Sequence, residues 1–117
     1  MGRVTTHILD TAGGCPAAGV PVELFALSGE ERTRLSGAST NADGRCEEPL
    51  LEGEGFQVGV YEILFHVGNY LRARGADLPS PAFLDVVPIR FGVASADEHY
   101  HVPLLISPYG YSTYRGS

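Results

Sequence analysis

Hydrophobic and polar residues alternate along most of this chain, in short segments that turn-favouring residues separate. Side chains of a β-strand point alternately to its two faces, so alternation with period two predicts strands with one buried face. The pattern is clear in residues 3–9, where Val4, Thr6 and Ile8 share one face, and it resumes in residues 20–27. The chain is therefore expected to fold into β-sheets.

Five further segments are expected to form strands, at residues 32–39, 46–51, 56–65, 83–93 and 99–106. Pro88 cannot donate a backbone hydrogen bond, so the segment that contains it belongs at a sheet edge or a bulge. The segment 32–39 has Leu35 as its only large hydrophobic residue and is expected at another edge. These strands are less regular than the first two.

One segment departs from period two. Within residues 66–73, Val67, Tyr70 and Leu71 follow the spacing of a helix, and Gly75 follows as a helix-terminating residue. Strands separated by turns and accompanied by one short helix are typical of a two-sheet β-sandwich. The sequence therefore predicts an all-β sandwich with about seven to eight strands.

Length and charge limit the classes of function. A chain of 117 residues can bury one core, so a single domain over residues 1–117 is expected. The formal net charge of -6 disfavours nucleic acids and anionic membranes as partners. The N-terminal residues lack the apolar segment of a secretory signal, which favours a cytoplasmic location. Cys15 and Cys46 lie in no Cys-x-x-Cys spacing and are expected to be thiols there.

Histidines lie beside expected core faces at both ends of the chain. His99 and His101 share one face of the last apolar segment, opposite the expected core residues Tyr100, Val102, Leu104 and Ile106. His7 is likewise opposite the apolar face of residues 3–9. A lone histidine on a strand is ordinarily a surface or hydrogen-bonded residue, so its position alone does not indicate a site.

Two other features supply different chemistry. Asn41-Ala-Asp-Gly44 favours a turn that places Arg45 directly after it, and the chain ends in Tyr114-Arg-Gly-Ser117. Imidazoles transfer protons near neutral pH, and a guanidinium binds planar anions through two hydrogen bonds. A terminal hydroxyl or carboxylate can orient a water molecule. In combination these groups suit hydrolysis of a small acidic ring.

A metal site is the competing interpretation. His7, His99 and His101 could supply the three imidazoles of a catalytic zinc site. The sequence shows no obvious carboxylate relay for these histidines, and a nearby Arg45 would repel the ion, so a metal is disfavoured. The tyrosines near the end of the chain suit simple packing, a pocket or a subunit interface; they are Tyr109, Tyr111 and Tyr114.

Four segments carry a resemblance to a known family: Thr6-His-Ile-Leu-Asp10, Thr40-Asn-Ala-Asp-Gly-Arg45, His99-Tyr-His-Val-Pro-Leu-Leu-Ile-Ser-Pro108 and Tyr114-Arg-Gly-Ser117. Together they resemble the transthyretin-like 5-hydroxyisourate hydrolases. The Tyr-Arg-Gly-Ser ending is the most specific mark, because the hormone-carrying transthyretins share the fold but lack this ending and the histidine and arginine set.

The resemblance implies a transthyretin-like sandwich that assembles as a homotetramer, with active sites at the interface between dimers. It also implies hydrolysis of 5-hydroxyisourate to 2-oxo-4-hydroxy-4-carboxy-5-ureidoimidazoline in urate degradation, a part of purine catabolism, with no cofactor or metal. The residues that match the family's catalytic set are His7, Arg45, His101 and Ser117. Those that match its substrate-binding set are His7, Arg45, Tyr114, Arg115 and Gly116.

Two questions stay open at the level of the sequence. The first is whether His7 or His101 activates the attacking water. The second is whether the chain turns over a substrate or, as a transthyretin-type carrier, only binds a small molecule in the same channel. An extracellular adhesion module is a third class, disfavoured by the lack of a signal segment and of a disulfide pattern.

Overall fold

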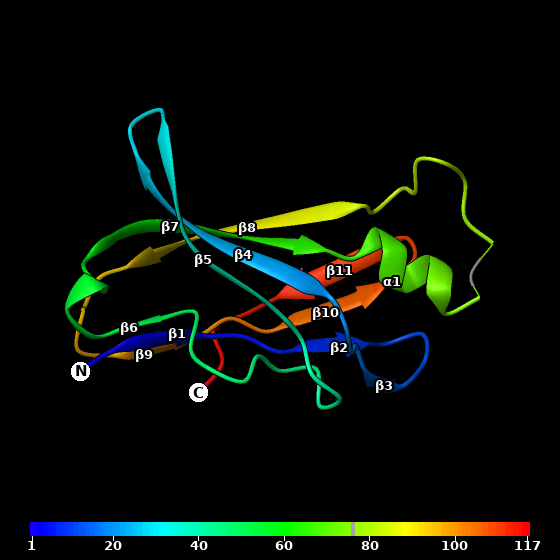
Figure 1. The fold of residues 1–117 in the computed structure, drawn as a ribbon, viewed down its shortest axis with the longest axis horizontal. Helices are drawn as coiled ribbons and strands as arrows, with labels where there is room; N and C mark the ends of the chain where they lie inside the picture. Colours follow the sequence, from blue (N-terminus) through cyan, green and yellow to red (C-terminus); the bar gives the residue numbers. More distant parts are fainter. Residues whose placement is uncertain (76) are drawn as a thin grey trace.

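The fold is described by a computed structural model that covers residues 1–75 and 77–117 (Figure 1). Its strands are β1 (Arg3–Thr5), β2 (Ile8–Asp10), β3 (Cys15–Pro16), β4 (Pro21–Ser28), β5 (Glu31–Ser39), β6 (Leu51–Glu52), β7 (Gly59–His66), β8 (Val86–Val93), β9 (His99–His101), β10 (Leu104–Ser107) and β11 (Gly110–Thr113). The helices are the 3-10 turn η1 (Gly53–Gly55) and α1 (Gly68–Ala73). Within the part described, no helix is long and apolar enough to cross a membrane.

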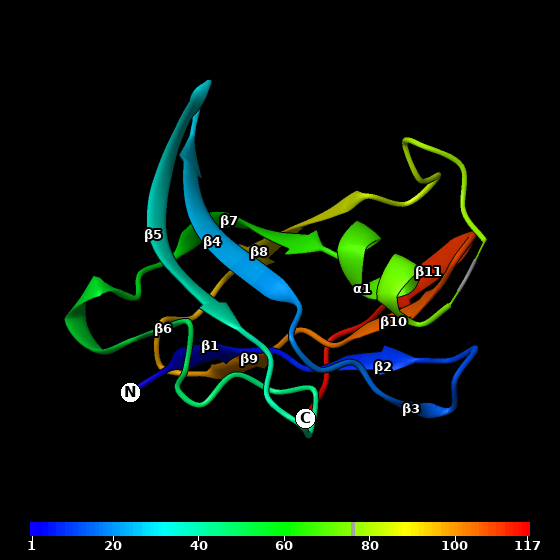
Figure 2. The ribbon, with the colours of Figure 1, turned by 45° about the vertical axis from the view of Figure 1, so that its right-hand side comes forward.

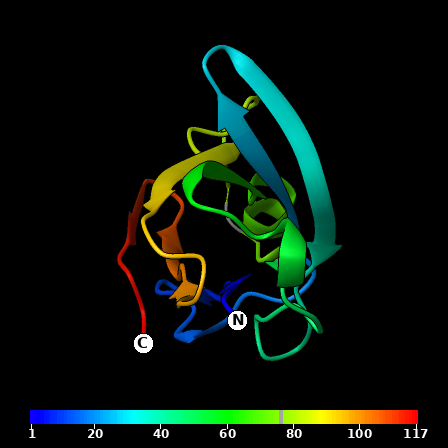
Figure 3. The same cartoon turned by 90° about the vertical axis from the view of Figure 1, so that its left-hand side faces the viewer.

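The strands form two packed layers, seen obliquely in Figure 2 and from one end in Figure 3. One layer is an antiparallel sheet in the order β5-β4-β7-β8. Its edges are therefore β5 and β8, as the sparse apolar content of the first and Pro88 in the second predict. The β4 and β5 hairpin extends beyond the body of the sandwich (Figure 1).

The second layer is divided into two short sheets, in the orders β6-β1-β9 and β11-β10-β2-β3. Both divisions fall where one expected strand breaks into two, at Thr6-His7 and at Val102-Pro103. Backbone hydrogen bonds still cross the break, because Val102 N donates to the Thr5 oxygen and Leu104 N to the His7 oxygen. The layer is thus continuous, with a local irregularity at the histidines.

The hydrophobic core lies between the two layers. The largest side chains with no more than 2% exposure include Ile8 and Leu104 from one layer and Leu24, Ile63 and Phe65 from the other. Burial of each such side chain contributes about 1.5–3 kcal/mol. The predicted core face is confirmed, since Tyr100, Val102, Leu104 and Ile106 are all buried, although His101 and Pro103 on the opposite face are buried too. The histidines of the same strands therefore face away from the main core.

Helix α1 lies beside the ends of β7 and β10, away from the N-terminus (Figure 1, Figure 2). It buries Leu71 and follows the buried Val67, as the helical spacing predicts. The Tyr70 hydroxyl donates to Oδ2 of the buried Asp10, 2.9 Å away, and joins the helix to the second layer. The expected helix at residues 66–73 is thus confirmed with a slightly later start.

Three expectations on strand bounds were wrong. The segment expected to begin at Phe56 begins instead at Gly59, in β7, because Phe56 N donates to the Gly53 oxygen and closes the turn η1. Residues 46–51 form a strand only at their end, in β6, because Pro49 has no N–H to donate and only Leu50 N bonds across, to the Val4 oxygen. The segment expected to begin at Phe83 begins instead at Val86, and Phe83 is exposed. The all-β sandwich with one short α-helix is otherwise as predicted, with shorter and more numerous strands.

Candidate active site

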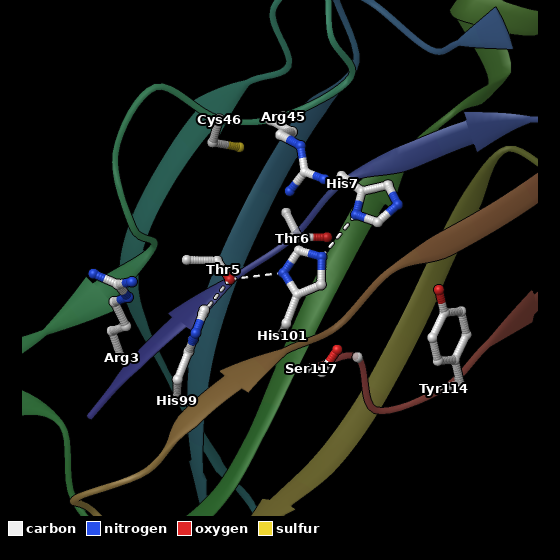
Figure 4. A pocket seen from close by; sticks show the side chains of 11 residues that line it. Arg3, Thr5, Thr6, His7, Arg45, Cys46, His99, His101, Tyr114 and Ser117 are labelled. Atoms are coloured by element: carbon white, nitrogen blue, oxygen red, sulfur yellow. Dashed lines mark hydrogen bonds between the residues drawn. The ribbon is translucent and has the colours of Figure 1, made fainter.

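The break in the second layer brings three histidines from two strands together (Figure 4). Strand β1 runs parallel to β9, so Thr5 pairs with His101 and Arg3 with His99. His7 lies in the break between β1 and β2, and its Nδ1 is 2.7 Å from Nε2 of His101. The ring centroids are 4.9 Å apart and the ring planes differ by 23°, so the two rings are nearly coplanar and meet edge to edge. Residues that are more than ninety positions apart in the chain thus form one imidazole pair.

The Thr5 hydroxyl extends this pair. Its Oγ1 lies 2.7 Å from Nδ1 of His101 and 2.6 Å from Nε2 of His99. Both ring nitrogens of His101 are therefore engaged, whereas His7 is hydrogen-bonded through Nδ1 alone within the described residues. The Nε2 atom of His7 is left to meet a ligand.

The Asn41 to Gly44 turn positions Arg45 above the rings. The Asn41 side-chain oxygen accepts hydrogen bonds from Asp43 N and Arg45 N, and Ile8 N donates to the Gly44 oxygen. Gly44 has a φ of 74°, and a Cβ there would lie 2.5 Å from the Ile8 oxygen, so only glycine fits. Arg45 then pairs with His7 as an isolated bridge. Its guanidinium points toward the imidazoles (Figure 4).

A cavity of about 470 Å³ lies over these side chains. Tyr114 and Ser117 approach it from the side of His101 opposite Arg45 (Figure 4). The backbone N of Gly116 donates to the His101 oxygen, 2.8 Å away, and holds the chain end in place. The residues that line the cavity are Arg3, Thr5, Thr6, His7, Arg45, Cys46, His99, His101, Tyr114, Gly116 and Ser117.

Arg115 is directed elsewhere. Its guanidinium lies over the Tyr100 ring, 4.0 Å from the centroid, and donates to the Glu98 carboxylate and the His99 backbone oxygen. It lies outside the set that lines the cavity. Of the predicted site residues, the fold therefore brings together His7, Arg45, His101, Tyr114, Gly116 and Ser117, and it turns the Arg115 side chain away.

The surroundings keep the imidazoles neutral at pH 7. Burial, with the nearby His7, Arg45 and His99, lowers the pKa of His101 to about 4. Burial and Arg45 lower the pKa of His7. Burial, Arg3 and Arg115 lower the pKa of His99. Neutral His7, with a lone pair available at Nε2 in one of its tautomers, is suited to accept a proton.

The described residues contain no group of three or more histidine, cysteine or acidic side chains placed to hold a metal ion. The imidazole nitrogens instead bond to one another and to Thr5. Both Cys15 and Cys46 are free thiols, and Cys46 lines the cavity. Burial raises the pKa of the Cys46 thiol, which makes it a poor nucleophile.

Sequence reasoning missed Thr5, Thr6, Arg3 and Cys46 as lining residues. Thr5 lies opposite the apolar face of residues 3–9, on the side of His7, and this shared face is the only signal that could have indicated it. Its partner histidine could not be identified, because the parallel pairing of β1 with β9 is a long-range property of the fold.

The fold and the site together define a small β-sandwich protein in which paired imidazoles and a guanidinium face one polar cavity. A family model described as the HIUase/Transthyretin family matches residues 4–116. This chain belongs to that family, which confirms the resemblance carried by its four segments.

Relatives and solved structures agree with this membership. The 5-hydroxyisourate hydrolase of Pseudomonas aeruginosa is 60% identical over 117 residues, which are 100% of this chain and 93% of the relative. The crystal structure of (S)-allantoin synthase superposes with a TM-score of 0.92 at 46% identity and covers 99% of this chain, which spans only 44% of that protein. Sea bream transthyretin in complex with thyroxine has a TM-score of 0.86 at 27% identity, with coverages of 97% and 94%.

Proposed function

We propose that this chain is an enzyme that hydrolyses 5-hydroxyisourate to 2-oxo-4-hydroxy-4-carboxy-5-ureidoimidazoline, in urate degradation. The observation that carries the proposal is the His7–His101 pair beneath the Arg45 guanidinium in one cavity. The identity of 60% to a 5-hydroxyisourate hydrolase over the whole chain supports the same substrate. The reaction needs a water molecule, a base and a group that stabilises negative charge, and it requires no cofactor or metal.

His7 is the proposed general base. Its Nε2 has no hydrogen bond among the described residues, whereas both nitrogens of His101 are engaged. His7 Nε2 takes a proton from water as the water oxygen bonds to the ring carbonyl carbon. The ring C–N bond then breaks, and the same proton passes to the leaving nitrogen. His101 orients His7 through the 2.7 Å hydrogen bond.

Arg45 is the proposed anion-binding group. Its guanidinium is directed toward the imidazoles, where a charge-assisted hydrogen bond to the carbonyl oxygen would strengthen as that oxygen becomes negative (Figure 4). Arg45 is exposed, so a substrate can reach it. Stabilisation that grows toward the transition state increases kcat and not only affinity.

The chain end completes the proposed site. The Ser117 hydroxyl positions the attacking water, and Tyr114 and Gly116 bound the cavity opposite Arg45. Arg115 is proposed to act indirectly, since its contacts to Glu98 and to the His99 oxygen fix the path of the terminal residues.

The remaining properties extend the proposal to the whole molecule. Residues 1–117 form a single domain of a cytoplasmic homotetramer, with each site at a dimer–dimer interface. Exposed tyrosines near β11 support an interface there, because Tyr109, Tyr111 and Tyr114 are 62%, 46% and 56% exposed in the single chain. Tyr114 also lines the cavity, so a second subunit packed against this tyrosine would lie beside the site.

A carrier of transthyretin type is the second candidate, favoured by the likeness to the thyroxine complex of sea bream transthyretin. A carrier for an apolar ligand needs an apolar lining. The lining here is dominated by imidazole, guanidinium and hydroxyl groups, which favours turnover.

The experiment that tests the proposal generates 5-hydroxyisourate from urate with urate oxidase and follows its absorbance decay. We expect the chain to accelerate the decay, and we expect deletion of residues 114–117 to remove most of the acceleration. A folded, tetrameric protein without acceleration would contradict the hydrolase and favour the carrier.

A further inference from the structure

The hydrogen bonds of the site continue past the proposed catalytic pair. They run from Nδ1 of His7 to Nε2 of His101, from Nδ1 of His101 to the Thr5 hydroxyl, and from that hydroxyl to Nε2 of His99. None of the three distances exceeds 2.7 Å. The chain leads from a half-buried ring in the cavity to an exposed ring at its rim.

The single hydrogen of the Thr5 hydroxyl limits this chain to two opposite orders of donors. The Thr5 hydroxyl carries one hydrogen, so it donates to one imidazole and accepts from the other. When Thr5 donates to His99, His101 must donate to Thr5 through Nδ1–H. Nε2 of His101 then accepts from Nδ1–H of His7, which leaves the lone pair of His7 Nε2 facing the cavity. This order is the one a general base requires.

A proton taken up at His7 Nε2 can reverse that order. His7 passes its Nδ1 proton to Nε2 of His101, His101 passes its Nδ1 proton to the Thr5 oxygen, and Thr5 passes its hydroxyl proton to Nε2 of His99. Three protons move and no other bond changes. The positive charge is then on His99, while His7 retains a proton at Nε2 for the leaving nitrogen.

Electrostatics favour this displacement of charge. An imidazolium at His7 would face the Arg45 guanidinium, and one at His101 would be buried among His7, Arg45 and His99. The groups that face His99 are Arg3 across β1 and the guanidinium of Arg115, which is paired with Glu98 at 3.1 Å. Burial, Arg3 and Arg115 lower the pKa of His99 too, but its side chain is exposed whereas His7 is half-buried and His101 is buried, so a charge on His99 is better solvated than on either of the other two.

We infer that Thr5 and His99 are positioning residues of the site, which fix the tautomers of His101 and His7 and receive, at the cavity rim, the charge that His7 takes up. The inference rests on the proposed hydrolysis for its kinetic consequence. Its structural part, the coupling of His99 to His101 through Thr5, is independent of any substrate.

The kinetic test compares Thr5→Val and His99→Gln with the native chain. Valine keeps the shape and β-propensity of threonine without the hydroxyl, and glutamine can bond to Thr5 but cannot take up the proton. We expect kcat to fall about 10- to 100-fold with little change in KM, as for other partners that orient a reacting group. Thr5→Ser should restore most of the rate, and imidazole buffer should rescue His99→Gln but not accelerate the native protein.

The matched control is Thr33→Val, at an exposed position of β5 away from the cavity. It should leave kcat and its pH profile unchanged. A Thr5→Val protein with the native kcat and pH profile would overturn the proposed transfer of protons through Thr5. Valine can replace a hydroxyl that only fills space without loss of activity.

Nitrogen-15 NMR of the histidine rings separates this inference from the proposed function. We expect Thr5→Val to alter the titration curves of both His99 and His101, and Thr33→Val to alter neither. If the titration curves of His99 and His101 are unchanged in Thr5→Val, the proposed coupling through Thr5 is overturned, whether or not the protein is active. A native protein that does not hydrolyse 5-hydroxyisourate, yet shows the coupled titration, contradicts the proposed function and retains the coupling.

Discussion

A Cβ atom on Gly116 would lie 2.7 Å from Cδ2 of the His101 ring. Side-chain atoms do not approach so closely, so the absence of a side chain at Gly116 allows the chain end to lie against the imidazole. The His101 ring cannot easily yield, because both of its nitrogens are hydrogen-bonded. The position of the terminal residues and the position of the imidazole pair therefore depend on each other.

Replacing this glycine should therefore impair the site more than the fold. We expect Gly116→Ala to reduce kcat about 100-fold, since displacement of a catalytic group by about 1 Å has an effect of that order. Steady-state kinetics on 5-hydroxyisourate measure the loss. Gly110→Ala is the control, because a Cβ at Gly110 would meet only Ser107 Oγ at an ordinary 3.5 Å. Equal activity of the two variants would contradict the proposed packing.

Removal of the Arg45 guanidinium should abolish most activity without unfolding the chain. Arg45 is exposed, and the turn before it is held by backbone and Asn41 contacts that Arg45→Ala keeps. Loss of one group that stabilises an oxyanion reduces kcat about 100- to 1000-fold. Arg34→Ala on β5 is the control for loss of a surface arginine. A fully active Arg45→Ala protein, shown by circular dichroism to be folded, would exclude the proposed role.

The pH dependence of kcat/KM should report His7. Burial and Arg45 both lower its pKa below the ordinary value of 6.5, so the neutral base persists and the acidic limb should lie below pH 6.5. The residual activity of Arg45→Gln should show that acidic limb at higher pH, because the charge of Arg45 no longer lowers the pKa of His7. An acidic limb that does not move on this substitution would indicate that another group is the base.

Stability should also depend on pH in a defined window. The pKa of His101 falls from 6.5 in the unfolded chain to about 4 in the fold, so the unfolded state binds more protons between these values. The contribution of neutral His101 to the free energy of unfolding is complete above pH 6.5 and is lost as the pH falls toward 4. Urea midpoints should therefore fall across this window in the native protein and less steeply in His101→Gln. If the urea midpoints of the two proteins fell equally steeply with decreasing pH, the buried environment assigned to His101 would be contradicted.

The sequence was sufficient for the parts of the fold that depend on local pattern. Alternation placed Val4 and Ile8 in the core with His7 on the opposite face, and Pro88 predicted an edge strand. The Asn41 to Gly44 turn was read correctly because its residues hydrogen-bond within the turn itself.

Long-range geometry lay beyond that pattern. The parallel register that sets Thr5 against His101 joins strands from opposite ends of the chain, so the local pattern places Thr5 on the face of His7 but does not identify its histidine partner. Arg115 shows the reverse case. It belongs to a motif that the sequence marks as a unit, yet cation–π contact with Tyr100 and an ion pair with Glu98 direct its side chain away from the cavity.

The most direct test of the account is the decay of 5-hydroxyisourate, followed by absorbance with the native chain, with His7→Gln and with His66→Gln. His66 is the matched control, since it bonds to Glu23 on the other sheet. We predict rapid decay with the native and His66→Gln proteins, and a loss of about 100-fold or more in kcat for His7→Gln. Native activity in His7→Gln would contradict the role of His7 as base, and no acceleration by the folded native chain would contradict the proposed hydrolase.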